Sequence, residues 1–149
     1  MTPVSPTFVQ LSPQHAETLR AAARAAYPHE CCGLLVGEGD ADIVVTDVVP
    51  TPNIAENPNA AFAIDPQAQF DLLRATRGSQ QRVVGHYHSH PDGPAQPSPR
   101  DLAMAHDPEA VWVVMTASAT SASMPRAFRH PCGAWSFVEV TVAIKEPVL

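Results

Sequence analysis

The feature that most constrains this chain is a strand that ends in two histidines and leads through a short loop into a helix. Residues 82–89 are typical of a strand, and residues two apart on a strand point to the same face. His88 and His90 therefore point together, with Cα atoms about 6–7 Å apart. Ser98 and Asp101 are three apart at a predicted helix start and also share a face. The seven-residue loop brings that helix end back to the strand end, so two imidazoles and a carboxylate should meet.

This combination of side chains indicates catalytic rather than structural metal binding. Structural zinc sites use four protein ligands, usually including cysteine, whereas catalytic sites use three and leave the fourth position for water. His88, His90 and Asp101 supply three ligands without a thiolate. The sequence therefore predicts a hydrolytic metal site.

Other interpretations of the same residues remain open. Ser98 and Asp101 also fit the capping signature [S/T]-x-x-[D/E] of a helix start. A His-x-His pair on a strand can be two satisfied histidines with no metal. His86 lies on the same strand face, so a three-histidine site is an alternative, but a straight strand places the first and third rings about 13 Å apart. We therefore interpret His86 either as a packing residue or as a residue that supports a metal ligand without binding the metal.

Length and composition define the class of protein. The chain has 149 residues and 45% hydrophobic content, which suits one domain over residues 1–149 with one core. Its net charge is −6 and it has no cluster of Lys and Arg, which argues against nucleic acid as a partner. No apolar run approaches the roughly 18 residues of a membrane helix. Residues 1–6 lack the features of a signal peptide, so we expect a cytoplasmic protein.

The three cysteines, Cys31, Cys32 and Cys132, do not form an even disulfide framework. We expect buried or half-buried thiols in a reducing compartment. The apolar run that follows Cys32 should raise its pKa, which disfavours the alternative of a cysteine nucleophile.

The order of predicted elements indicates an α/β (α+β) domain, a single mixed curved sheet with flanking helices. Helices are expected at 13–26, from 65 to a stop at Gly78, and from 99 to about 105. Strands are expected at 8–11 (an edge strand), 32–36, 43–49, 61–64, 82–89, 110–117, 127–130 and 135–144.

Two segments of the chain together resemble the JAMM (MPN+) metalloprotease family. Its signature of H-[S/T]-H, seven residues and S-x-x-D is matched by His88, Ser89, His90, Ser98 and Asp101. Upstream, residues 28–37 read P-H-E-C-C-G-L-L-V-G and are similar to the family's P-x-E-x-C-G-L-L-x-G, with Glu30 at the glutamate position. The resemblance spans at least residues 28–114.

The resemblance implies a fold, a cofactor and roles for these residues. It implies a cytidine-deaminase-like fold and one catalytic Zn²⁺ held by His88, His90, Asp101 and a water. Glu30 would be the general base, and Ser98 would help to hold the oxyanion. The chain is similar to the short prokaryotic branch, without the long insertions of eukaryotic deubiquitinating members. That branch implies cleavage of a peptide or isopeptide bond at the C-terminal tail of a ubiquitin-like or sulfur-carrier protein, including release of cysteine or a tail extension.

Two competing functions follow from other features. A zinc nucleobase deaminase carries H-x-E and P-C-x-x-C. This chain has His15-Ala16-Glu17 and Pro131-Cys132, but position 135 is Trp rather than the second cysteine. The second alternative is a non-catalytic MPN scaffold, which the intact ligand set disfavours.

Overall fold

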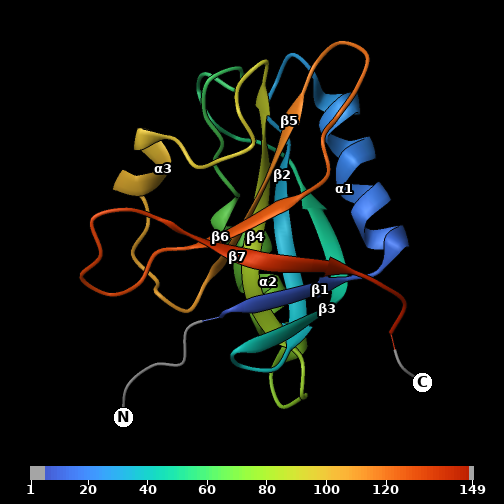
Figure 1. The fold of residues 1–149 in the computed structure, drawn as a ribbon, viewed down its shortest axis with the longest axis vertical. Coiled ribbons are helices and arrows are strands. Elements are labelled where there is room, and N and C mark those ends of the chain that lie inside the picture. The colour runs from blue at the N-terminus through green and yellow to red at the C-terminus, as the bar shows by residue number, and fades with distance from the viewer. Residues whose placement is uncertain (1–5, 148–149) are drawn as a thin grey trace.

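The computed structural model describes residues 6–147, so most of the N-terminal segment considered for a signal peptide lies outside the described residues. These residues form three helices and one strongly curved sheet, whose curvature can be followed in Figure 1. In chain order the elements are β1 (Phe8–Leu11), α1 (Pro13–Ala26), β2 (Cys32–Glu38), β3 (Asp42–Thr51), α2 (Pro66–Thr76), β4 (Arg82–Pro91), α3 (Pro99–Ala103), β5 (Val111–Ala117), β6 (Arg126–Arg129) and β7 (Val138–Ile144).

Helix α1 begins and ends where its sequence predicts. The Ser12 hydroxyl accepts a hydrogen bond from the backbone N–H of His15 at 3.0 Å, which satisfies one free donor of the first turn. A proline follows at the first helical position, where its missing N–H costs nothing. The buried side chains of α1 lie on one face and join the main core: Ala16, Leu19 and Ala23.

The sheet closes on itself as a barrel in the order β1-β3-β2-β4-β5-β6-β7. Strand β1 pairs in parallel with both β3 and β7, and this double pairing makes the closure. The prediction of a mixed curved sheet with flanking helices is confirmed. The prediction that residues 8–11 form an edge strand is wrong, because β7, which follows more than a hundred residues later, covers the second side of β1.

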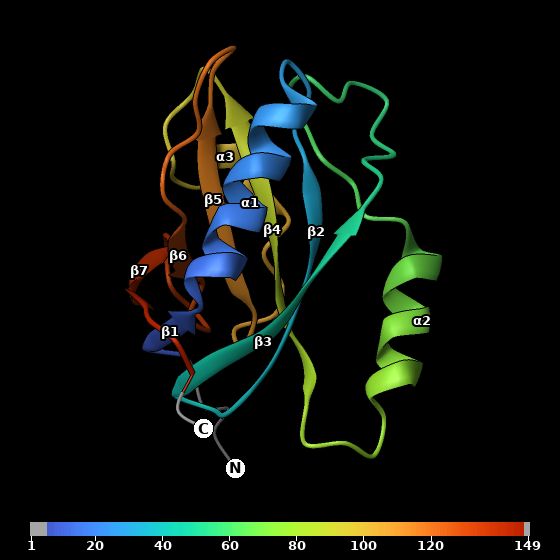
Figure 2. The same ribbon diagram turned by 90° about the vertical axis from the view of Figure 1, so that its right-hand side faces the viewer.

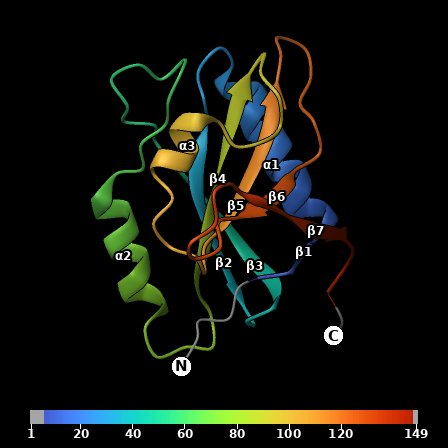
Figure 3. The same ribbon diagram turned by 60° about the vertical axis from the view of Figure 1, so that its left-hand side comes forward.

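Strand β4 lies between β2 and β5 in the barrel, and its two faces have different packing environments. It runs antiparallel to β2 and parallel to β5. Tyr87 is fully buried in the main core, which also contains Leu19 of α1. His86 and His88, on the alternate face, lie beside Trp112 of β5. Figures 2 and 3 show α1 on one side of β4 and β5, and α2 and α3 on the other. The histidines therefore face the α3 side.

Three local predictions differ from the structure. Residues 61–64 are extended but make only an isolated bridge between Asn53 and Ile64, so they are not a strand. Helix α3 ends at Ala103, because Met104 takes the C-cap and its N–H returns to the carbonyl of Asp101. Strand β7 begins at Val138, because a turn precedes it in which the N–H of Ala134 donates to the carbonyl oxygen of Pro131.

The cysteines follow the prediction in two cases out of three. Cys32 is buried and Cys31 is half-buried, but Cys132 is exposed, contrary to expectation, because it lies in the turn before β7. Burial raises the pKa of Cys32, as its apolar neighbours predict. Within residues 6–147, no helix combines the length and the apolar character needed to cross a membrane.

Candidate metal centre

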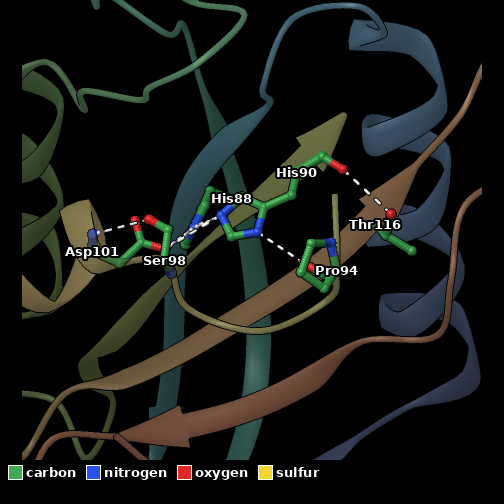
Figure 4. A network of polar contacts seen from close by, with 6 residues as sticks. All are labelled: His88, His90, Pro94, Ser98, Asp101 and Thr116. Atoms are coloured by element: carbon green, nitrogen blue, oxygen red, sulfur yellow. Dashed lines mark hydrogen bonds and ion pairs between the residues drawn. The ribbon is translucent and has the colours of Figure 1, made fainter. Parts of the chain in front are cut away.

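Strand β4 brings the two motif histidines together at its C-terminal end. The Nε2 atoms of His88 and His90 lie 3.0 Å apart (Figure 4). Residues 88 and 90 share one face of the strand, so their rings converge instead of diverging. The geometry expected from the spacing of two residues is therefore present.

The carboxylate of Asp101 completes the group from the other side of the loop. Its Oδ2 atom lies 3.0 Å from Nε2 of His88 and 3.3 Å from Nε2 of His90. All three residues are largely or fully enclosed, with His88 fully buried and Asp101 only 4% exposed. Helix α3, which starts at residue 99, carries the carboxylate back over the end of β4 (Figure 4).

The three donor atoms suit a tetrahedral metal ion. Zn–N and Zn–O bonds of about 2.0–2.2 Å in tetrahedral geometry require ligand atoms roughly 3.2–3.5 Å apart. The observed separations of 3.0, 3.0 and 3.3 Å lie close to that range. Two imidazole nitrogens that face each other at hydrogen-bond distance beside a carboxylate are also the donor set of catalytic zinc sites. The residues therefore fit the ion that the resemblance implies.

Different neighbours orient the two rings. Nδ1 of His90 lies 2.9 Å from the carbonyl oxygen of Pro94, which fixes its tautomer with Nδ1 as the donor. The ring of His88 stacks on Phe62, with ring centroids 4.2 Å apart and planes inclined by 17°. Nδ1 of His88 is buried without a hydrogen-bond partner among the described residues. Aromatic packing, rather than a second hydrogen bond, therefore holds His88.

Ser98 and Asp101 form the capping box that their spacing also predicts. The Ser98 hydroxyl accepts the backbone N–H of Asp101 at 3.1 Å, and Oδ2 of Asp101 accepts the backbone N–H of Ser98 at 2.8 Å. The same Oδ2 atom faces the two histidines. The capping and metal-site interpretations are thus compatible, because the cap fixes the carboxylate in place for the histidines.

Glu30 lies beside this group although it is 58 residues before His88 in the chain. Strands β2 and β4 pair antiparallel with Cys32 opposite His88, so continuing the register by two residues places Glu30 opposite His90. Ligand atoms of Glu30, His88 and His90 all lie within 4.8 Å of one another. Glu30 is only 6% exposed.

Burial dominates the electrostatics of the group. It raises the pKa of the Glu30 carboxyl to about 7, although a charged His90 nearby opposes the rise. It also lowers the pKa of His88, which favours the neutral imidazole that a metal needs. For Asp101, burial opposes ionisation, but hydrogen bonds with both histidines hold its pKa well below the usual range.

The competing ligand sets are not assembled among residues 6–147. His86 packs edge-on against Trp112, with ring centroids 4.3 Å apart. Burial lowers the pKa of His86 to about 3, which suits a packed neutral ring. Of the deaminase-like residues, Glu17 pairs with Arg20 and Arg24 on the surface of α1. Cys132 is exposed.

Two supporting residues carry no clear signal in the sequence. Ser89 is fully buried, and its hydroxyl accepts the backbone N–H of Cys31 at 2.8 Å, which joins β4 to the segment that carries Glu30. Phe62 comes from the loop before α2 and covers His88. The middle position of H-S-H marks Ser89 only as part of the motif, and nothing local marks Phe62, because both act through contacts far along the chain.

Known proteins resemble this chain over most of its length. The family model described as prokaryotic homologs of the JAB domain matches residues 12–131. A "Desampylase" from Haloferax volcanii is 32% identical over 126 residues, covering 85% of this chain and 86% of that one. A "Probable TtuB-protein conjugate cleaving protease" from Thermus thermophilus is 38% identical over 89 residues, covering 60% of this chain and 57% of that one.

A solved structure shares the fold. The solution structure of a Desulfitobacterium hafniense protein superposes with a TM-score of 0.77 at 31% identity, covering 95% of this chain and 94% of that one. Similarity of this extent assigns the chain to a class of proteins with this mixed α+β fold. The chain belongs to the family of prokaryotic homologues of the JAB domain, and the JAMM (MPN+) resemblance is confirmed.

Proposed function

We propose that this protein is a zinc-dependent JAMM peptidase that hydrolyses a peptide or isopeptide bond at the C-terminal tail of a ubiquitin-like or sulfur-carrier protein. The observation that carries the proposal is the convergence of three donor atoms, from His88, His90 and Asp101, within 3.0–3.3 Å of one another. The buried carboxyl of Glu30 lies beside them. The name of the Thermus thermophilus relative, which specifies cleavage of TtuB–protein conjugates, supports this class of substrate.

His88, His90 and Asp101 would hold the zinc ion. When bound, zinc lowers the pKa of a coordinated water to about 7 and polarises a carbonyl group. Both side chains are in the protonation state that zinc binding would require, because burial keeps His88 neutral and hydrogen bonds keep Asp101 ionised. Pro94 holds the ring of His90 through its carbonyl oxygen.

Glu30 is the proposed proton carrier. It takes a proton from the attacking water and later passes that proton to the leaving amine. Burial raises its pKa to about 7, and a group with a pKa near the working pH both accepts and returns a proton efficiently.

Ser98 is the proposed hydrogen-bond donor to the oxygen that becomes negative in the transition state. Its hydroxyl oxygen accepts the N–H of Asp101, which leaves the hydroxyl proton free to donate. Loss of one such donor typically costs about 3 kcal/mol of barrier stabilisation.

The direct test is incubation with a ubiquitin-like carrier from the same genome, followed by intact-mass measurement. One substrate carries a C-terminal peptide extension, and a second carries a lysine-linked conjugate, so the two bond types are separated. We expect the mass of the mature carrier to appear, a chelator to abolish the reaction and zinc to restore it. If the zinc-loaded protein leaves both substrates intact, the proposed substrate class is wrong.

Two variants test the assigned roles. Glu30→Gln should keep stoichiometric zinc but lose turnover, because glutamine cannot accept the proton. His88→Ala should lose both zinc and turnover, because it removes a ligand. Full activity of zinc-loaded Glu30→Gln would exclude the proposed base, and stoichiometric zinc in purified His88→Ala would exclude the proposed ligand set.

The location of the protein is also a proposal. A cytoplasmic location is supported by the three free cysteines, since a reducing compartment keeps thiols in this state. Fractionation of the host cells would test it, and recovery outside the cytoplasmic fraction would contradict it.

A further inference from the structure

A single side chain in the loop between β3 and α2 uses all of its hydrogen-bonding capacity. The amide nitrogen of Asn53 donates to the carbonyl oxygens of Glu30 and Ala61, each at 3.0 Å. Its amide oxygen accepts the backbone N–H groups of Ala55 at 3.1 Å and Ala63 at 3.0 Å. An asparagine side chain has two donor hydrogens and one oxygen with two lone pairs, so no further partner is needed.

This arrangement exceeds what a turn requires. A local asparagine turn accounts only for the bond to Ala55, two residues ahead. The other three bonds join residues 8, 10 and 23 positions away. Asn53 therefore connects separate segments of the chain rather than stabilising its own turn.

One of those segments carries the proposed base. Glu30 lies two residues before Cys32, where β2 begins, so its backbone is outside the regular hydrogen-bond ladder of that strand. Residues of the loop between β3 and α2 provide hydrogen bonds in place of a neighbouring strand. The backbone N–H of Glu30 donates to the carbonyl oxygen of Pro58 at 2.8 Å, and the carbonyl oxygen of Glu30 accepts from the Asn53 side chain. The backbone from which the Glu30 carboxyl projects is thus held by residues of the 52–64 loop.

The other connected segment carries the ring that covers His88. The bonds from Asn53 to Ala61 and Ala63 lie on either side of Phe62, whose ring stacks on His88 at 4.2 Å. Phe62 also lines a cavity of about 270 Å³ that reaches Asp101. A single amide group therefore fixes the base and the wall of the adjacent cavity with respect to each other.

We propose that Asn53 is a positioning residue for the reaction, which holds the backbone of Glu30 in register with Phe62 and with the His88 ring beneath it. The inference rests on the proposed function, because it takes Glu30 as the proton carrier. None of the four hydrogen bonds of the Asn53 side chain goes to a proposed zinc ligand, so its loss should affect proton transfer rather than metal content.

Asn53→Asp is the sharpest variant, because it keeps the shape and the accepting oxygen. The second oxygen replaces the amide nitrogen and faces the carbonyl oxygens of Glu30 and Ala61, so both donated bonds are lost. Asn59→Asp is the matched control, since it makes the same change in charge at an exposed position of the same loop. Leu19→Ala, which removes a buried side chain of α1 from the core, shows how much kcat falls through loss of stability alone.

Kinetics of carrier cleavage, zinc content and amide hydrogen exchange are measured on all forms. For Asn53→Asp we expect kcat to fall about 10- to 100-fold, as a small misplacement of a catalytic group does, with zinc content unchanged. KM should change less than about threefold, because the displaced group, Glu30, acts in proton transfer rather than in substrate binding. In the metal-free protein, the amide of Glu30 should exchange at least about tenfold faster than in the wild type. Asn59→Asp should match the wild type in every measurement.

Several outcomes would overturn the proposal. Asn53→Asp could keep the kcat of Asn59→Asp, or Leu19→Ala could lose as much kcat as Asn53→Asp, which would reduce the effect to stability alone. If the wild type cleaves no carrier, the proposed function fails, and the exchange experiment still decides whether Asn53 holds Glu30. Unchanged protection of the Glu30 amide in Asn53→Asp would show that it does not.

Discussion

Replacing Glu30 with glutamine should change how the stability of the metal-free protein depends on pH. Burial raises the pKa of this carboxyl from 4.5 to about 7. The folded state therefore binds the proton more tightly than the unfolded state does. The resulting stabilisation is complete below the unfolded pKa of about 4.3 and is lost as the pH rises through the folded pKa. Between pH 4.5 and pH 8, the wild type should lose free energy of unfolding that Glu30→Gln keeps.

The size of the effect follows from the shift. A rise from 4.5 to about 7 corresponds to an upper limit of about 3 kcal/mol. The pKa of about 7 already includes the opposing charges of His90 and Arg100, and the remaining solvent contact of this residue, which is 6% exposed, screens the carboxyl further. We therefore expect the difference in free energy of unfolding between Glu30→Gln and wild type to grow by about 1–2 kcal/mol from pH 4.5 to pH 8.

Urea unfolding of chelator-treated proteins measures this difference directly. Glu56→Gln is the control, because this exposed carboxyl of the neighbouring loop contacts water in the folded and the unfolded state. Its difference from wild type should be the same at both pH values. If Glu30→Gln also differs from wild type by a constant amount, the carboxyl is not desolvated and the reasoning from burial is wrong.

Three further predictions concern the rest of the fold. Zinc should raise the melting temperature, because it binds the folded state. At a zinc concentration of 100 times Kd the free energy of unfolding should rise by about 2.7 kcal/mol, and a thermal scan of His88→Ala should show no rise in melting temperature. Tyr87→Phe should raise the free energy of unfolding by about 1 kcal/mol, since the buried hydroxyl has no partner among the described residues, and a loss in urea unfolding would contradict this. Gly85→Ala should lower the free energy of unfolding by more than about 3 kcal/mol or prevent folding, because a Cβ atom would clash with the carbonyl oxygen of Val111. A Gly85→Ala variant as stable as the wild type would refute the close approach of β4 and β5.

The local elements follow from the sequence because their signals are local. The Ser12-Pro13 cap and the proline at position 28 give the bounds of α1, and both act within one helical turn. The convergence of His88 and His90 follows from the two-residue period of a strand. Predictions at less regular segments were less accurate: residues 61–64 have the composition of a strand but find only one bridging partner.

By itself, the sequence predicted the convergence of the trio His88, His90 and Asp101, the helix cap that holds Asp101 and the type of fold, since each depends on spacing within a strand, a turn or a helix. The tertiary structure alone decided what lies around that trio. It places Glu30 opposite His90 through the pairing of β2 with β4, and it closes the barrel by laying β7 against β1. It also joins Asn53 to Glu30 across 23 residues. Such contacts depend on which segments, far apart in the chain, pack against each other and bury their surfaces. The periodic pattern of one segment shows which face is buried but does not identify the segment that covers it.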